Sequence, residues 1–393
     1  MKKFYIDYTG DSLGNKEVKF HGGGDFSRFI LWKLDNVIRE TQRYEIVLLW
    51  PNGVNIDSLS VEEKQIRTSF AYKDITSITD VEYEEGDILF LPLLDCLSVR
   101  KIGAVKSVCP NLKVKGVLHG TRLLDVSRYD KYDKYYYDGL RANPIYLWTR
   151  RWLAALIAKV VMKKYLPLAD NIYTVSNSSM QKINEIARTK YLKFFYRNIT
   201  QVPDANGITK VTSGERFALF INSNRYEKNF IRSLIAFCRY KESSTDDLKL
   251  YVLGASDLLK RNIARIKEIN QNVVKEWVCF LGYVEADALK RLYSNCEFLL
   301  YTSKSEGYGL PPMEVMAAGR PSVVSATTSV PEVLGMGAYY VDPYDINSIK
   351  NGIQFMADRN NQRVYTDRFK ELSSALFLRG DHDINSLVTE LIM

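Results

Sequence analysis

The stretch "SKSEGYGLPPMEVMAAGRP", residues 303–321, holds two carboxylates eight positions apart, Glu306 and Glu314. Two glycines and a Pro–Pro pair lie between them, so the segment cannot be the middle of a helix or an ordinary strand. The apolar run before it, residues 297–303, predicts a buried strand, and the two prolines suit the first turn of a helix. The stretch therefore predicts a strand, a loop with Glu306, and a helix that carries Glu314 near its start.

This arrangement favours a sugar nucleotide as ligand. Ligands of open α/β sheets bind beyond the carboxyl ends of the strands, and a helix amino end attracts phosphate. Carboxylates accept hydrogen bonds from vicinal hydroxyls. A second strand end, "FINSNRYEKNF" (220–230), is followed by Arg225 and Lys228. Basic residues at the start of a helix are unfavourable for the helix dipole unless an anion offsets them, and Arg and Lys both bind phosphate.

The rest of the chain predicts an α/β fold with parallel sheets. Amphipathic stretches of helical period alternate with short apolar, β-branched runs that are typical of buried parallel strands. A polar segment at 198–215 reads as a linker. We therefore predict two Rossmann-like domains, residues 1–205 and 206–375, and a short C-terminal helix, 376–393, that packs back on the first domain. The predicted strands are 45–50, 87–94, 114–120, 171–176, 217–223, 248–254, 277–284, 297–303 and 321–326, and the predicted helices are 25–39, 228–240, 257–270 and 285–294.

Composition narrows the function classes. The net charge of +8 allows nucleic acid, membrane surfaces or anionic substrates as partners. The five cysteines are scattered without a C-x-x-C pair, so neither a disulfide framework nor a zinc site is expected. No apolar run has the length of a membrane span, and the first residues lack a signal-peptide core. These features predict a cytoplasmic protein without a metal.

Two further motifs lie in the first domain. The glycines of "FHGGGDFSRF" (20–29), Gly22 to Gly24, form a loop that opens a helix, but the pattern is neither a dinucleotide fingerprint nor a P-loop. In "VLHGTRLLD" (117–125), His119 follows a strand and is expected to face an interdomain cleft. The glycine loop could equally be a plain turn, and His119 an ordinary strand-end histidine.

Together these motifs resemble the GT-B retaining glycosyltransferases of family 4, also called group 1. The E-x7-E motif of "SEGYGLPPMEVMAAGRP" carries most of the resemblance. The family's order along the chain is also matched by four other stretches: "NRYEKN", "HGGG", "LHG" and "LGYVEADALKRLYSNCEFLLYTS". The resemblance implies a GT-B fold with two Rossmann-like domains that face a central cleft. It is close over residues 215–345 and looser in the first domain.

The resemblance also implies roles for particular residues. Glu314 would hold the ribose of the nucleotide, and Glu306 the donor sugar. Arg225 and Lys228 would neutralise the diphosphate, and His119 would face the reacting centre. The implied catalytic residues are His119, Glu306, Arg225 and Lys228; the implied donor-binding residues are Gly23, Gly24, Arg225, Lys228, Gly282, Tyr283, Val284, Glu306, Gly307, Tyr308, Gly309, Leu310 and Glu314.

We therefore predict a retaining hexosyltransferase that needs no metal or cofactor and adds a sugar from a nucleotide diphosphate donor to a bacterial-type surface glycan, such as lipopolysaccharide or capsule, carried on a lipid. The alternatives are another GT-B enzyme, namely a sugar-nucleotide epimerase or a phosphorylase, and a non-catalytic partner subunit. The sequence specifies neither the base and sugar of the donor nor the acceptor, the linkage or the oligomeric state.

One segment suggests where the protein works. Residues 128–165 contain nine Lys/Arg against three Asp, together with seven tyrosines and two tryptophans. Trp148, Trp152, Leu156 and Val160 recur at helical spacing. Such a stripe is typical of a core helix, but aromatic and basic residues together also favour a membrane interface. No nucleic-acid-binding module is visible, so an anionic membrane surface is the predicted partner, with the protein peripheral on the inner face of the plasma membrane.

Overall fold

The computed structural model describes residues 1–10, 22–197 and 214–393. The chain divides into two compact units. Unit 1 comprises residues 1–121, 156–197 and 380–393, and unit 2 comprises 122–155 and 198–379. Each unit contains one wholly parallel sheet, so the predicted α/β fold with two parallel-sheet units is confirmed.

The sheet of unit 1 has seven strands in the order β3-β2-β1-β4-β5-β6-β7. Its central strands are apolar on both faces because helices cover both sides of a parallel sheet, and the side chains of β1 and β4 are almost entirely buried. The strands are β1 (Lys2–Asp7), β2 (Tyr44–Pro51), β3 (Ala71–Ile75), β4 (Ile88–Leu94), β5 (Lys113–Leu118), β6 (Asn171–Thr174) and β7 (Leu192–Phe194).

The helices of unit 1 begin where local sequence satisfies their free N–H groups. Ser60 caps α2 and forms a capping box with Glu63, a pattern that fixes the first turn of a helix. The Ser176 hydroxyl caps the helix that follows β6 by accepting from the Ser179 N–H. The helices that belong wholly to this unit are α1 (Gly22–Thr41), α2 (Val61–Ser69), α3 (Arg100–Val108) and α6 (Asn177–Asn184).

The sheet of unit 2 has six strands in the order β10-β9-β8-β11-β12-β13. They are β8 (Phe217–Phe220), β9 (Lys249–Leu253), β10 (Val278–Gly282), β11 (Phe298–Tyr301), β12 (Ser322–Ser325) and β13 (Tyr339–Val341). The buried helix α7 packs with them in one apolar core. The helices are α4 (Arg122–Asp125), α7 (Phe230–Lys241), α8 (Asp257–Ile263), α9 (Gln271–Trp277), α10 (Ala286–Asn295), α11 (Leu310–Ala317), α12 (Val330–Leu334) and α13 (Ile346–Ala357).

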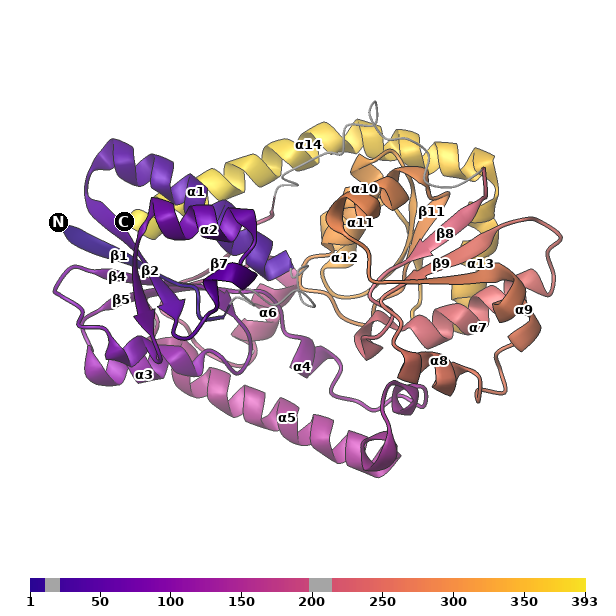
Figure 1. The fold of residues 1–393 in the computed structure, drawn as a ribbon, viewed down its shortest axis with the longest axis horizontal. Coiled ribbons are helices and arrows are strands. Elements are labelled where there is room, and N and C mark those ends of the chain that lie inside the picture. Colours follow the sequence, from indigo (N-terminus) through magenta and orange to yellow (C-terminus); the bar gives the residue numbers. More distant parts are fainter. Residues whose placement is uncertain (11–21, 198–213) are drawn as a thin grey trace. The chain divides into compact units, whose positions relative to one another are not determined.

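Two long helices contribute residues to both units. They are α5 (Pro144–Tyr165) and α14 (Arg359–Ile392), and both are unbroken (Figure 1). The prediction of a short C-terminal helix was wrong in length, because α14 has 34 residues and continues through Gly380. A single glycine weakens a helix by only about 1 kcal/mol, which tertiary packing outweighs. The last residues of α14 belong to unit 1, where the Lys115 Nζ donates to the Glu390 carbonyl at 2.7 Å.

Other boundaries also differ from the predictions. All nine predicted strands are present, but the predicted helix 257–270 ends at Ile263 and a second helix begins at Gln271. Residues 122–155 belong to unit 2 rather than to the unit that precedes them in sequence. The reason is a set of long-range polar contacts, described below. The predicted linker, 198–215, lies almost wholly outside the described residues.

Candidate functional site

Two polar loops follow neighbouring strands at the carboxyl edge of the unit 2 sheet. Strands β8 and β11 pair directly, and the strand order reverses between them. Such a reversal is where open α/β sheets bind ligands. The loop after β8 carries Arg225 and Lys228, and the loop after β11 carries Glu306. The topology therefore brings the predicted basic residues and a predicted acid to one place.

Lys228 and Glu306 form a direct ion pair. The Lys228 Nζ lies 2.5 Å from Glu306 Oε1 and 3.0 Å from the Tyr301 hydroxyl. Only 7% of the Lys228 side chain and 12% of the Glu306 side chain are exposed. Burial, together with the neighbouring Glu306 carboxylate, raises the pKa of Tyr301 well above its usual value, so this hydroxyl stays protonated. The predicted phosphate contact and the predicted sugar contact thus neutralise each other when no ligand is bound.

Arg225 is held differently. Its Nε donates to Glu227 Oε1 at 2.7 Å, and Glu227 also accepts from Arg122 at 2.9 Å. Burial alone would raise the pKa of Glu227, but the Arg225 and Arg122 guanidiniums hold it below its usual value. Because 42% of the Arg225 side chain is exposed, its guanidinium is oriented by Glu227 and remains accessible to an anion.

The loop that carries Glu306 is fixed by the residues after β12. The Glu306 N–H donates to the Thr328 hydroxyl at 3.0 Å, and the Ser329 hydroxyl donates to the Glu306 and Tyr308 carbonyls at 3.0 and 3.1 Å. Gly309 has φ +102°, a conformation that favours glycine. The loop is therefore preorganised by its own hydrogen bonds.

Glu314 lies in the second turn of α11 and is partly buried. The Tyr293 hydroxyl hydrogen-bonds to it, and burial and the Glu314 carboxylate together raise the pKa of Tyr293 well above its usual value. The helix begins at Leu310, and no side chain caps its amino end. Gly307 lies between Glu306 and this helix start, so the E-x7-E stretch folds as strand, loop and helix, as predicted.

The predicted donor-binding residues Gly282, Tyr283 and Val284 lie at the end of β10 and directly after it, two strands away from β8 along the same edge. Gly282 has φ +66°, and its carbonyl accepts from the Gly254 N–H at 2.9 Å. Tyr283 is exposed and Val284 is partly exposed. These residues lie on the same sheet edge as Lys228.

The predicted residues of unit 1 are His119, Gly23 and Gly24. His119 follows β5, and its Nε2 lies 2.8 Å from the Pro92 carbonyl. Because a carbonyl only accepts, Nε2 carries the proton and Nδ1 is an acceptor. Burial and the nearby Arg197 lower the pKa of His119 to about 4, so the ring is neutral at pH 7. Gly22 to Gly24 form the first turn of α1 rather than a loop before it, and the residues that precede them lie outside the described ranges.

Sequence reasoning missed a buried group of charges beside these loops, which we call the buried ion cluster. It consists of Asp130, Asp133, Arg151, Arg232 and Lys304. The Lys304 Nζ lies 2.7 Å from Asp133 Oδ1 and 3.3 Å from Asp130 Oδ2. Asp133 also pairs with Arg151, and Asp130 with Arg232. Burial opposes ionisation of Asp130, yet Lys304 and Arg232 hold its pKa below the usual value.

The buried ion cluster joins residues 122–155 to the loop that holds Glu306. Lys304 lies two residues before Glu306, and its N–H donates to the Glu227 carbonyl at 2.7 Å. Ser305 donates to Asp125 Oδ2 at 2.8 Å. Lys304 and Asp133, and Ser305 and Asp125, are more than 170 positions apart in the sequence, so no local pattern could have indicated these pairs.

The cluster also corrects one expectation about residues 128–165. Arg151 is buried against Asp133 and its guanidinium lies over the Tyr226 ring, so it is not available to a membrane. Tyr132 and Tyr136 are buried in the core of unit 2. These three side chains are therefore internal parts of this unit and not surface groups.

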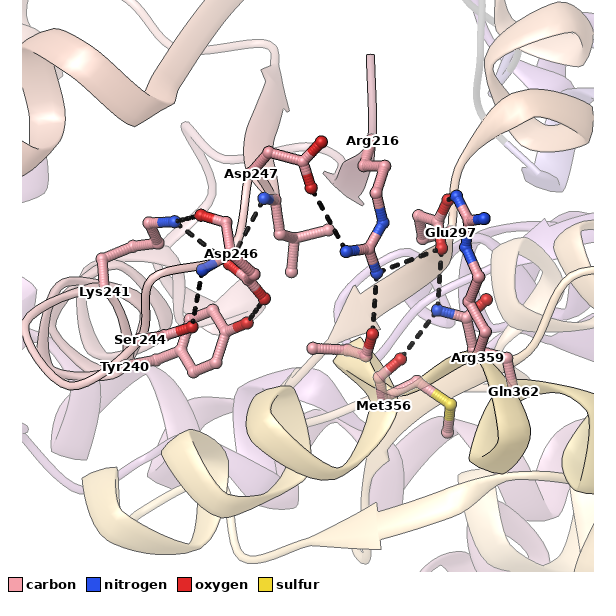
Figure 2. Close-up of polar contacts among 12 residues, drawn as sticks. Arg216, Tyr240, Lys241, Ser244, Asp246, Asp247, Glu297, Met356, Arg359 and Gln362 are labelled. Carbon is pink, nitrogen blue, oxygen red and sulfur yellow. Dashed lines mark hydrogen bonds and ion pairs between the residues drawn. The ribbon is translucent and has the colours of Figure 1, made fainter. Parts of the chain in front are cut away.

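A polar hollow of about 450 Å³ lies at the opposite, amino edge of the same sheet. Figure 2 shows its network: Arg216 contacts Asp247 at 3.2 Å and Glu297 at 3.5 Å, and Gln362 donates to Glu297 at 2.9 Å. These residues precede β8, β9 and β11 or belong to α14. Because ligands of this fold bind at the carboxyl edge of the sheet, the hollow at the amino edge is separate from the candidate site.

Comparison with known proteins agrees with this geometry. Residues 204–371 match the family described as "Glycosyl transferases group 1". The chain is 36% identical over 99 residues to O-antigen chain mannosyltransferase B of Escherichia coli. The aligned residues make up 25% of this chain and 24% of that protein. It is 27% identical over 199 residues to the O-antigen chain mannosyltransferase RfbU of Salmonella typhimurium, with 50% and 53% covered. The chain thus spans between about a quarter and about half of these curated relatives.

Solved structures share the whole fold. Sucrose-phosphate synthase from Thermosynechococcus elongatus superposes with a TM-score of 0.65 at 16% identity, covering 100% of this chain and 98% of that one. Anabaena HepE, solved in complex with UDP and glucose, superposes with a TM-score of 0.62 at 13% identity, covering 99% of each chain. Identities this low establish the GT-B fold alone.

Proposed function

Because residues 204–371 belong to the group 1 glycosyltransferases, we propose that this protein transfers a sugar from a nucleotide diphosphate donor to a bacterial surface glycan. The observation that carries the proposal is the Lys228–Glu306 contact at the reversal point of the unit 2 sheet. It places a cation for the diphosphate beside an acceptor for sugar hydroxyls. The O-antigen mannosyltransferase relatives support mannose as the sugar.

The proposed chemistry uses the charges already present. As the bond to the sugar breaks, negative charge grows on the departing diphosphate, and preorganised cations stabilise it. Arg225 is oriented for this by Glu227, while Lys228 exchanges its contact with Glu306 for one with phosphate. Glu306 is then available to the sugar. The reaction would proceed without a metal and with retention, the leaving phosphate accepting the proton of the acceptor hydroxyl on the same face.

His119 is suited to a hydrogen bond with a neutral group rather than to an interaction with a charged one. Its neutral ring with an accepting Nδ1 suits a hydrogen bond from a sugar hydroxyl. Glu314 would accept from the ribose hydroxyls. We further propose that the acceptor is carried on a lipid, so that the protein works at a membrane surface.

Thermal unfolding with a panel of nucleotide sugars tests the proposal. A ligand at a hundred times its Kd stabilises by about 2.7 kcal/mol, so the donor should raise Tm and unrelated nucleotides should not. Release of nucleotide only when acceptor is added then separates a transferase from an epimerase, which needs no acceptor, and from a phosphorylase, which releases none. The absence of protection by every nucleotide sugar would refute the proposal.

A further inference from the structure

The outer side of helix α5 is apolar and exposed along most of its length. A helix that is apolar on all sides is ordinarily buried, and α5 does bury one side, with Leu147, Ala158 and Met162 fully inaccessible. On the other side 53% of Trp148, 55% of Trp152 and 59% of Val160 are exposed. We call this exposed side the α5 outer face; its large apolar residues are Trp148, Trp152, Leu153, Leu156, Ile157 and Val160.

The residues of this face are contiguous on the helix. At 100° per residue, the exposed positions from Trp148 to Lys164 fall on about half of the circumference, and the buried positions fall on the other half. Isolated exposed apolar side chains are normal, but a contiguous group of this kind marks an interaction surface.

The charges on this face identify the kind of partner. Helix α5 contains no Asp or Glu. Four basic residues are exposed among or beside the apolar ones: Arg150, Lys159, Lys163 and Lys164. An apolar face with interspersed bases and two tryptophans is the composition of helices that lie in the headgroup region of an anionic bilayer. Lysine stems cover apolar surface while their ammonium groups reach the phosphates.

From this composition we infer that the α5 outer face docks the protein onto an anionic phospholipid bilayer, with Trp148 and Trp152 at headgroup depth. Docking would be peripheral, since no helix among the described residues is both long and apolar enough to cross a bilayer. Within the original stretch 128–165 we place the docking surface on this face, and Arg151 takes no part in it because it is buried against Asp133.

Two other occupants fit less well. A second copy of the chain would bring the same helix against itself in a twofold interface, and its bases would then meet without acidic partners. A nucleic acid would satisfy the bases, but the aliphatic side chains between them would gain nothing from phosphates. A bilayer satisfies both the apolar residues and the bases.

This inference deepens the proposed function, since a lipid-linked acceptor resides at such a surface, but its test uses vesicles without acceptor or donor. The full chain is sedimented with vesicles of phosphatidylcholine alone or mixed with phosphatidylglycerol, at low and high salt. We expect binding only to the anionic vesicles, and weaker binding as salt shortens the Debye length below about 10 Å. Emission of Trp148 and Trp152 should shift to shorter wavelength on binding.

Matched variants locate the surface. Trp148→Ala with Trp152→Ala should weaken binding about tenfold per tryptophan, and should remove the emission shift. Lys159→Gln with Lys163→Gln should weaken binding about fivefold per charge. The controls are Ile56→Ser with Val61→Ser, and Arg265→Gln with Lys267→Gln, which change exposed residues of the same kinds outside α5.

Three results would overturn the inference: wild type that stays in solution with anionic vesicles at low salt, α5 variants that bind as well as the controls, or a tryptophan variant that changes the oligomeric state or RNA binding but not vesicle binding. Donor protection measured in parallel is expected to be unchanged in every variant. If no donor protected the wild type against unfolding, that result would count against the proposed function and not against the docking face.

Discussion

Replacing Asp133 by Asn tests the buried ion cluster. The cluster holds three cations and two carboxylates, and the side chains of Asp133 and Lys304 are only 1% and 4% exposed. Asp133→Asn leaves Asp130 as the one carboxylate for Lys304, Arg151 and Arg232. Removing one partner of a buried pair typically costs about 3–5 kcal/mol, because the other charge remains buried without compensation. We expect a loss of unfolding free energy of that size.

The converse substitution should cost less. Lys304→Met leaves two carboxylates, each still paired with an arginine, so no charge is stranded. The loss is then that of hydrogen bonds to charged groups, about 1.5–3 kcal/mol. If the cluster were only a sum of equivalent salt bridges, the two substitutions would lower the unfolding free energy equally.

Urea unfolding followed by tryptophan fluorescence measures both, since Trp148, Trp152 and Trp277 lie in unit 2. The control is Asp367→Asn, which breaks an exposed pair with Lys370 at 3.3 Å and should change stability by less than about 1 kcal/mol. The reasoning fails if Lys304→Met is the more destabilising variant, or if Asp133→Asn is no worse than the control.

The remaining predictions concern the candidate site. Glu314→Ala should mainly weaken binding of the nucleoside diphosphate, whereas Glu306→Gln should mainly lower kcat; calorimetry with the opposite pattern would contradict the assignment. Arg225→Ala or Lys228→Ala should each lower kcat by about a hundredfold or more, and near-normal rates would mean that other groups hold the diphosphate. Activity should persist in EDTA, and a loss that a divalent ion restores would disprove the metal-free reaction. The pKa of His119 falls from its usual 6.5 to about 4 on folding, so the unfolded chain binds more protons between these pH values and the protein loses stability as the pH falls from 6.5 toward 4. His119→Gln should remove about 2 kcal/mol of this loss at pH 5. If the two proteins show the same pH dependence of stability, the ring is not neutral and buried in the folded state.

The sequence predicted what short-range pattern determines. Buried parallel strands are continuous apolar runs, so the nine strands with that pattern were found. Four strands were missed. Strand β1 was missed because its apolar run, Phe4 to Ile6, is only three residues long. Strand β3, "AYKDI", is almost wholly exposed at a sheet edge and has no such run, and β7 and β13 have three residues each. The loop geometry around Glu306 was likewise predictable, because glycine and proline restrict the backbone locally.

What the sequence did not predict depends on distant partners. Asp130 and Asp133 stand in a strongly basic, tyrosine-rich segment, and nothing in the local sequence indicates that these two carboxylates are buried. Their partners, Arg232 and Lys304, are separated from them by about a hundred residues or more. Lys228 was predicted to contact phosphate, but its pairing with Glu306 follows from the adjacency of β8 and β11, which sequence order alone does not reveal.

The division of the chain into these two units limits which fragments of the protein can fold and which segments relatives can exchange by recombination. Unit 2 includes residues 122–155, which lie outside the segment 204–371 that matches the group 1 glycosyltransferases. An excised fragment of that segment would keep Lys304 and Arg232 but lose both carboxylates, so it is not an interchangeable module. Unit 1 in turn includes residues 380–393, so it cannot be completed during synthesis until the segment that follows unit 2 in the sequence has been made. We therefore expect recombination between relatives to exchange the segments that carry Arg232 and Lys304 together with the earlier segment that neutralises them.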